Sequence, residues 1–344
     1  MKMTMKMTMK TLSKYLLATA TLALMSTTAS AQFADRTIRA SNGVNVDHPV
    51  GNGIKIMTTC LATKSGGKMK LQAFWAGALG GDLQATQALR SGTQEMVVSS
   101  SSPLVGILPD LGVFDLPFLF SSEKEADAIL DGAYGKFIAE KLPAAGLVNL
   151  SYWENGFRNL TNSKKAVEKV EDFPGLKVRV MQNNIFLDTF KTVGANAVPM
   201  AFQEVFAALE TKAIDGQENP FVTIDTSKMY EVQKFLSVTR HAYTPFLLLY
   251  SKPLFDKLSA DEQKALMDCA AEGQKEQRTV SRVLNETSLA NLKKEGMLVN
   301  EIAPEQQKRM RDAVKPVYER ATVTIGKETV DRMQTELAKI RGTN

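Results

Sequence analysis

Short strand-like runs alternate with helix-like segments from residue 36 onward, and this order constrains the fold more than any other feature of the sequence. Arg36–Ala40, Lys68–Phe74 and Glu95–Ser99 have the pattern of strands. Between them, Val50–Lys64 and Asp82–Ser91 have helical patterns, the second beginning at an aspartate cap and ending before a glycine. A β-α-β-α-β order favours an α/β fold with a parallel sheet and with ligands at the carboxyl ends of the strands.

The same alternation continues through the middle of the chain. Ile185–Val193 carries apolar residues at helical spacing, and Asn183 or Asn184 can cap this helix. Another helix is predicted to begin at Phe202. From Ser259 onward the sequence has the amphipathic pattern of long helices with one solvated side. Three more strands are predicted before Ser259, namely Leu147–Trp153, Leu176–Met181 and Phe246–Tyr250.

The first 31 residues are typical of a secretory signal peptide. Lys2, Lys6, Lys10 and Lys14 form a basic start without any acidic residue. An apolar run of about 11 residues and the small residues Ala29-Ser30-Ala31 follow it. That run is well short of the roughly 20 residues that a membrane-spanning helix needs. We therefore predict cleavage after residue 31 and a periplasmic location.

The basic leader also changes the meaning of the net charge. The chain carries 42 Lys and Arg against 37 Asp and Glu, a formal net charge of +5. Without the four lysines of the leader, 38 basic residues stand against 37 acidic ones. Binding of a polyanion depends on a strongly basic surface, so we expect no nucleic-acid partner.

Few residues are available for metal or redox chemistry. The sequence has two cysteines, Cys60 and Cys269, and two histidines, His48 and His241. An exported protein meets oxidising conditions, which makes a disulfide the alternative to free thiols. Because both cysteines lie in helix-like segments far apart in the sequence, we expect two separately buried thiols. The spacing of these four residues predicts no zinc site, and we expect no cofactor.

Motifs that carry catalytic chemistry are missing from the sequence. We find no G-x-S-x-G, no H-E-x-x-H and no P-loop. His48 and His241 are not paired with a candidate nucleophile in the sequence, and we interpret them as loop or packing residues. The protein is therefore not expected to be an enzyme.

The region between residues 150 and 220 places one cation among amides. Arg179 lies near the carboxyl end of a predicted strand, and Gln182 follows it closely. Phe202 opens the next helix, and Asn219 lies in Asp215–Pro220, a polar segment predicted to be a turn. An arginine at the end of a strand can bind a carboxylate through two parallel hydrogen bonds. From spacing alone, however, a salt bridge of Arg179 on a solvated face is slightly favoured.

Several motifs, in the same order along nearly the whole chain after the leader, resemble a known family. That family is the solute-binding proteins of tripartite ATP-independent periplasmic (TRAP) transporters, which includes the C4-dicarboxylate receptors. Several matches in order are far more specific than any single one. The matching segments are Leu79-Gly-Gly-Asp82, Phe114-Asp-Leu-Pro-Phe118, Tyr152-Trp-Glu-Asn-Gly-Phe-Arg158, Pro174-Gly-Leu-Lys-Val-Arg179 and Asp215-Gly-Gln-Glu-Asn-Pro220.

The resemblance implies a two-lobe periplasmic binding protein fold of the α/β class. Each lobe is a sheet flanked by helices, and crossing hinge segments near residues 155 and 245 and a long lobe-spanning helix join them. The first lobe is expected to hold residues 32–155 and 245–284, and the second lobe residues 156–244 and 285–344. The lobes are expected to close on a small organic anion, which is then delivered to the small and large integral membrane subunits of a TRAP permease.

The resemblance also assigns roles to four residues. Arg179 matches the arginine that grips the ligand carboxylate, and Arg158 matches a frequent second contact. Asn219 matches an asparagine of the binding site, and Phe202 matches the aromatic residue that often covers the ligand. From their positions in the sequence, further contacts are expected at Gln182, Gln217, Glu218, Asn45, His48 and the Ser99–Ser102 turn.

The amides around Arg179 bear on the identity of the ligand. Each hydroxyl of a polyhydroxylated acid both donates and accepts hydrogen bonds, and amides can serve both needs. The segments Met181–Asn184 and Gly194–Pro199 also resemble receptors for sugar acids. We therefore predict a hexuronate such as glucuronate or galacturonate. A C4-dicarboxylate, with Arg158 as a second cation, is the alternative, and an exported enzyme acting on an organic acid is a further one.

Overall fold

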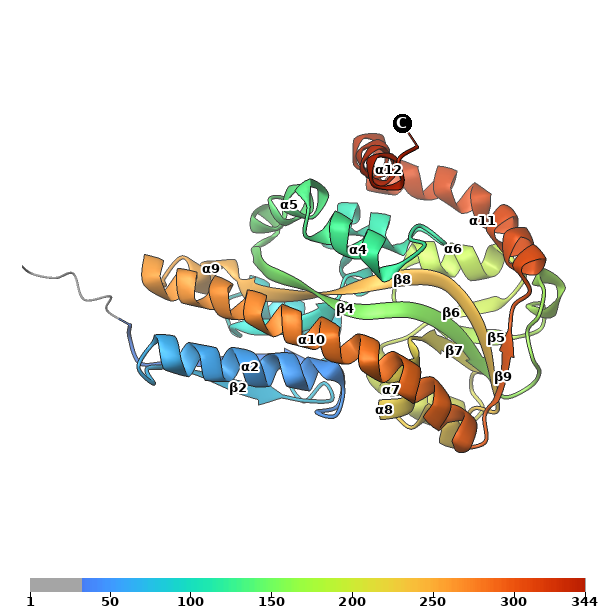
Figure 1. Cartoon of the computed structure of the whole chain (residues 1–344), viewed down its shortest axis with the longest axis horizontal. Helices are drawn as coiled ribbons and strands as arrows, with labels where there is room; N and C mark the ends of the chain where they lie inside the picture. Colours follow the sequence, from blue (N-terminus) through green and yellow to red (C-terminus); the bar gives the residue numbers. More distant parts are fainter. Residues whose placement is uncertain (1–32, 344) are drawn as a thin grey trace, which may run out of the picture.

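The computed structural model describes residues 33–343 and has a mixed α/β architecture (Figure 1). Within these residues the strands form one nine-stranded sheet in the order β2-β1-β3-β8-β4-β7-β5-β6, with β9 paired to β8. The predicted signal peptide lies outside the described residues. The strands are β1 (Arg36–Asn42), β2 (Met69–Phe74), β3 (Met96–Ser100), β4 (Leu147–Asn162), β5 (Lys177–Val180), β6 (Asn196–Pro199), β7 (Gly216–Asn219), β8 (Phe235–Ser251) and β9 (Leu298–Glu301).

Helices cover both faces of this sheet (Figure 1). We use "first lobe" for β1, β2 and β3 with α2 and α3, and "second lobe" for β5, β6 and β7 with α6, α7 and α8. The residue boundaries predicted for the lobes remain predictions. The α-helices are α2 (Pro49–Lys64), α3 (Asp82–Arg90), α4 (Glu123–Leu130), α5 (Ala133–Ala139), α6 (Asn184–Thr192), α7 (Phe202–Glu210), α8 (Phe221–Thr226), α9 (Lys252–Phe255), α10 (Ala260–Lys294), α11 (Pro304–Ile325) and α12 (Lys327–Arg341).

The first lobe has the predicted β-α-β-α-β order, with β1 parallel to both β2 and β3. One local prediction was wrong, because Gly81 and not Asp82 is the N-cap of α3. Asp82 is the first helical residue, and its Oδ2 accepts a hydrogen bond from the backbone N–H of Ser100, 3.3 Å away. The Asp82 carboxylate is therefore directed toward the end of β3.

Two strands are much longer than predicted, and both pass from one lobe to the other. β4 has 16 residues and β8 has 17, and they pair antiparallel along most of their length. The strand predicted over Leu147–Trp153 therefore continues to Asn162, and the expected turn Asp215–Pro220 contains β7, which pairs with β4. These polar segments form strands because their side chains bond to one another across the sheet, for example Asn155 to Thr244 at 3.1 Å.

The crossing of β4 and β8 is irregular where the hinge was predicted. The register shifts between Glu154 and Gly156, opposite Pro245 and Thr244 of β8. Gly156 has a φ of 115°, a conformation that is strained for residues with a Cβ. A bulge bends and twists a strand locally, so the two strands change direction at this point.

Helix α10 is the predicted long helix that spans both lobes, and it extends along much of the molecule (Figure 1). It begins with a capping box in which Ser259 accepts from the N–H of Glu262. Near its start it packs on α2, where Gly53 and Gly273 allow close approach: a Cβ on Gly273 would lie 2.9 Å from the carbonyl oxygen of Gly53. Near its end, Asn291 donates to Asp225 of α8 at 2.7 Å.

A disulfide joins Cys60 of α2 to Cys269 of α10, with 5.5 Å between the two Cα atoms. The expectation of two separately buried thiols was therefore wrong. The two helices are distant in sequence but pack side by side, and this packing brings the sulfurs together. The bond attaches the amino-terminal part of α10 to the first lobe.

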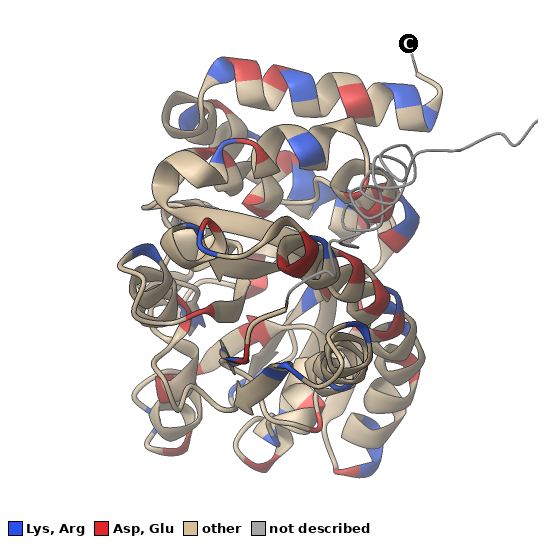
Figure 2. Cartoon of the chain, turned by 90° about the vertical axis from the view of Figure 1, so that its left-hand side faces the viewer, with Lys and Arg blue, Asp and Glu red and all other residues tan. Residues whose placement is uncertain are grey.

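Across residues 33–343, no helix is both long enough and apolar enough to cross a membrane. The same residues contain no group of three or more His, Cys, Asp and Glu side chains arranged to hold a metal ion. On the face shown in Figure 2, basic and acidic residues are interspersed along the surface helices.

Candidate functional site

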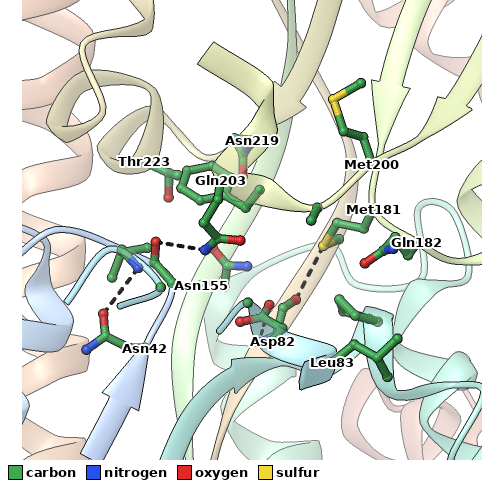
Figure 3. Close-up of a pocket in the computed structure, with 18 of the residues that line it drawn as sticks. Asn42, Asp82, Leu83, Asn155, Met181, Gln182, Met200, Gln203, Asn219 and Thr223 are labelled. Carbon is green, nitrogen blue, oxygen red and sulfur yellow. Dashed lines mark hydrogen bonds between the residues drawn. The ribbon is translucent and has the colours of Figure 1, made fainter. Parts of the chain in front are cut away.

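A cavity of about 460 Å³ opens between the two lobes and takes its lining from both (Figure 3). The first lobe contributes the end of β1, the loop before α3 and the end of β3. The second lobe contributes the end of β5 and the start of α7, and the crossing strand β4 contributes Asn155 and Arg158. The cavity thus lies at the carboxyl ends of parallel strands, as the strand order predicted.

Arg179 lies at this cavity with one nitrogen uncommitted. Its Nε and Nη2 donate to the carbonyl oxygen of Met200, at 3.0 and 2.7 Å. Its Nη1 is buried and has no hydrogen-bond partner among the described residues. The side chain is 2% exposed, and burial lowers its pKa to about 10. The salt bridge on a solvated face, favoured by spacing alone, was therefore wrong.

Arg158 is also at the cavity, but its charge is balanced within the protein. Its Nη2 lies 3.0 Å from Oε1 of Glu218 and 3.0 Å from Oδ1 of Asn219. Burial would raise the pKa of Glu218, but the Arg158 charge and a hydrogen bond from His241 outweigh it and hold that pKa below its ordinary value. Glu218 is fully buried behind Arg158 and does not line the cavity.

Three other predicted residues line the cavity. Asn219, at the end of β7, faces it from beside Arg158, and its Nδ2 donates to Oε1 of Gln217 at 2.5 Å. Gln182 lies on the loop after β5 and is exposed at the cavity edge. Phe202, the first residue of α7, forms part of the wall.

The contacts expected from the first lobe are placed differently. His48 is fully buried, where its Nδ1 accepts from the N–H of Val50 and caps α2. Its Nε2 lies 3.3 Å from Oγ1 of Thr223, and burial lowers its pKa to about 3. Asn45 is exposed and donates to the carbonyl oxygen of Thr226. Neither side chain lines the cavity, whereas Ser100 of the Ser99–Ser102 turn does.

Sequence reasoning missed several polar residues of the cavity. Asp82 is the most unusual of them, because burial raises its pKa to about 6 while the Ser100 N–H and the Arg179 charge act in the opposite direction. It belongs to the Leu79–Asp82 segment, whose resemblance to the family was the available signal. The other missed polar residues are Asn42, Gln84, Asn155, Gln203, Glu204 and Thr223.

Residues 40–324 match the family model described as bacterial extracellular solute-binding protein, family 7. The chain belongs to this family. The resemblance to TRAP transporter receptors, drawn from short motifs, is thereby confirmed. The match covers both lobes, the crossing strands and all of α10, so the receptor architecture extends over most of the described chain.

Individual relatives agree with this assignment. The 2,3-diketo-L-gulonate-binding periplasmic protein YiaO of Escherichia coli is 38% identical over 239 residues, 70% of this chain and 73% of its own. Among solved structures, the sugar acid binding protein DctPAm of Advenella mimigardefordensis, in complex with galactonate, is 47% identical with a TM-score of 0.88. The alignment covers 90% of this chain and 99% of that one.

A second solved structure extends the comparison to a uronate complex. It is a TRAP periplasmic solute-binding protein from Sulfitobacter with bound β-D-galacturonate. That protein is 31% identical to this receptor with a TM-score of 0.82, and the alignment covers 88% of this chain and 98% of that one. The two-lobe fold predicted from the sequence is confirmed by both structures.

Proposed function

We propose that this receptor binds a six-carbon sugar acid outside the cytoplasm and delivers it to a TRAP permease with a small and a large membrane subunit. The single observation that carries the proposal is that Nη1 of Arg179, at the cavity between the lobes, has no hydrogen-bond partner within residues 33–343. A buried donor without a partner is costly, and a ligand carboxylate would satisfy it with a charge-assisted hydrogen bond.

Closure of the lobes would strengthen this contact. We propose lobes of residues 32–155 with 245–284 and 156–244 with 285–344, moving about the irregular crossing of β4 and β8. Expelling water from the cleft lowers the local dielectric constant, which increases the attraction between Arg179 and an anion. The receptor changes no covalent bond of the ligand, and neither a cofactor nor a metal takes part. Cleavage of the leader after residue 31 and a periplasmic location complete the proposal.

The charges of the cavity favour a sugar acid over a C4-dicarboxylate. A dicarboxylate needs a second free cation, but the Arg158 charge is already balanced by Glu218. Asp82 lies at the same cavity, and its carboxylate would repel a second ligand carboxylate and accept hydrogen bonds from hydroxyls. One carboxylate with a chain of hydroxyls therefore fits the donors and acceptors better than two carboxylates.

Relatives support the same ligand class. The solved complexes with galactonate and β-D-galacturonate and the diketogulonate-binding relative involve six-carbon sugar acids. Hexuronates, the predicted ligands, share one carboxylate and several hydroxyls with the hexonate galactonate. We therefore propose a hexuronate such as glucuronate or galacturonate as the ligand, and galactonate as the other member of the class to test.

A thermal-shift panel on the purified protein tests the proposal. It contains D-glucuronate, D-galacturonate, D-galactonate and succinate, and hits are followed by calorimetric titration. A ligand at 100 times its dissociation constant adds about 2.7 kcal/mol of stability, so a sugar acid that binds raises the melting temperature clearly. A larger shift with succinate would favour the dicarboxylate alternative. Chemical conversion of the bound acid, followed by mass spectrometry, would support the enzyme alternative.

A further inference from the structure

One side chain of the second lobe is seated among backbone atoms of the first lobe, at the edge of the cavity. Gln203, the second residue of α7, extends toward the loop after β1 and the loop before α3 (Figure 3). Three glycines surround its amide. A Cβ on Gly43 would lie 3.0 Å from Nε2, one on Gly77 would lie 2.8 Å from Cγ and Nε2, and one on Gly81 would lie 2.7 Å from Oε1.

We call Gly43, Gly77 and Gly81 together the seat of Gln203. These positions require glycine because of the Gln203 side chain and not only because of the backbone conformation. Gly77 has a φ of 73°, which favours glycine in any case. Gly81 has a φ of −70°, which any residue adopts, and Gly43 is not in the positive-φ region either. At these two positions a methyl group would meet the Gln203 side chain first. The Nε2 of Gln203 also donates to the carbonyl oxygen of Gly43 at 3.4 Å.

The geometry points to Gln203 as a latch that holds the lobes closed over the ligand, an inference that rests on the proposed receptor function. The seat combines two loops of the first lobe, whereas Gln203 is carried by α7 of the second, so opening of the cleft must withdraw the amide. The Gln203 side chain is exposed, so it can withdraw from the seat into solvent when the cleft opens. It acts as a positioning residue, because it retains a ligand that Arg179 binds.

Two other contacts join the same loop of the first lobe to the second lobe. Asn45 donates to the carbonyl oxygen of Thr226 at 3.3 Å, and His48 lies 3.3 Å from Thr223. They bind the loop to α8, whereas Gln203 joins it to α7 at the cavity itself. Removal of Gln203 alone therefore leaves the fold of both loops intact while weakening closure next to the ligand.

A substitution at a neighbouring glycine can displace the Gln203 amide while residue 203 itself stays unchanged. In Gly81→Ala, the atoms of the described residues within 4 Å of the new Cβ all belong to Gln203, apart from those of residue 81 and its two chain neighbours. The variant should therefore displace the Gln203 amide and reproduce the effect of Gln203→Ala. Gly106→Ala is the matched control, because Gly106 is exposed and a Cβ there meets no atom of residues 33–343 within 4 Å beyond its chain neighbours.

We measure binding and release of D-galacturonate, or of whichever acid of the panel stabilises the wild type most. Gln203→Ala and Gly81→Ala should each raise the dissociation constant about three- to tenfold, the effect of losing one hydrogen bond. The change should lie in the release rate, with association within about twofold of the wild type. The double variant should match the single ones, because both changes remove the same contact.

The outcomes separate the latch from the receptor function. If the wild type binds an acid and Gln203→Ala releases it at the wild-type rate, the latch is overturned and the proposed function stands. Additive effects in the double variant, or an equal loss in Gly106→Ala, would also overturn it. If the wild type binds none of the acids, the proposed function fails. The latch is then tested without ligand, through the distance between spin labels at Lys55 and Glu210, and it is overturned if Gln203→Ala leaves that distance distribution unchanged.

Discussion

Arg158 and Glu218 form an ion pair from which solvent is almost fully excluded, with side chains 1% and 0% exposed. The pair joins β4 to β7, next to the cavity. Glu218 balances the charge of Arg158, whereas one nitrogen of Arg179 has no hydrogen-bond partner in the part of the chain that the structure describes. The two arginines therefore differ in role: one stabilises the sheet beside the site, and the other is available for an anion.

Removing the Glu218 charge should destabilise the fold. In Glu218→Gln the guanidinium of Arg158 stays buried without its counter-charge, which typically costs about 3–5 kcal/mol. Denaturant unfolding should show this loss as a lower midpoint. Glu210→Gln, on the exposed surface of α7, is the control and should stay within about 0.5 kcal/mol of the wild type. An unchanged midpoint in Glu218→Gln would contradict the role given to the pair.

Removing the Arg179 guanidinium should abolish most of the affinity for the ligand. Loss of one partner of a buried charge pair costs about 2–5 kcal/mol in binding, so Arg179→Ala should weaken it roughly 30-fold or more. Arg179→Lys keeps the charge but loses the planar guanidinium, so its affinity for the ligand should lie between those of the wild type and Arg179→Ala. Calorimetric titration measures all three proteins, and an equal dissociation constant in Arg179→Ala would refute the assignment.

Acidification should reduce the preference for sugar acids over dicarboxylates. Burial raises the pKa of Asp82 to about 6, so the carboxylate is charged at neutral pH and becomes neutral as the pH falls through that value. The repulsion of a second ligand carboxylate should therefore decrease between pH 7.5 and pH 5. The ratio of the dissociation constants for succinate and D-galacturonate measures this change.

The control for that experiment is Asp82→Asn. In this variant the ligands still change their protonation with pH, but residue 82 does not. The variant should bind succinate better relative to D-galacturonate at pH 7.5, and its ratio should depend less on pH. Identical pH profiles for the two proteins would show that Asp82 does not discriminate between the ligands.

Reduction of the disulfide should lower the stability of the whole receptor. The Cys60–Cys269 bond closes a loop across a sequence separation of 209 residues. In the chain-entropy account a bond of this kind contributes about 2–5 kcal/mol by restricting the unfolded chain. The melting temperature should fall in the presence of a reductant. A variant with both cysteines changed to serine should melt lower and should not respond to the reductant.

Local patterns were sufficient for the elements whose burial follows a simple period. Strands β1, β2, β3 and β5 and helices α2, α3, α6 and α7 lie within a few residues of their predicted bounds. The second half of β4 was missed because its polar residues resemble a loop. Thr161, for example, is buried and accepts from Nε2 of Gln217 at 2.9 Å, a partner that becomes visible only when β7 is placed beside β4.

Prediction of the site had a similar limit. The resemblance located Arg179, Arg158, Asn219 and Phe202, which all line the cavity, and their roles in binding stay predictions. His48 and Asn45 were predicted as contacts from their position in a loop, and this was wrong. Both side chains are directed toward α8 by their contacts with it, which the sequence pattern does not reveal. The sequence around Gln203 did not predict its contact with the first lobe, because the glycines that surround its side chain come from two other segments.

The continuity of β4 and β8 limits how receptors of this architecture can be recombined. β8 pairs with β3 of the first lobe, β4 pairs with β7 of the second lobe, and β4 and β8 pair with each other, so a lobe cut from the chain would lose part of its own sheet. A chimera that exchanges whole lobes between two receptors must match four strand segments in register at once. Ligand preference is therefore expected to be transferred more readily by exchanging single side chains at the cavity than by exchanging lobes as modules.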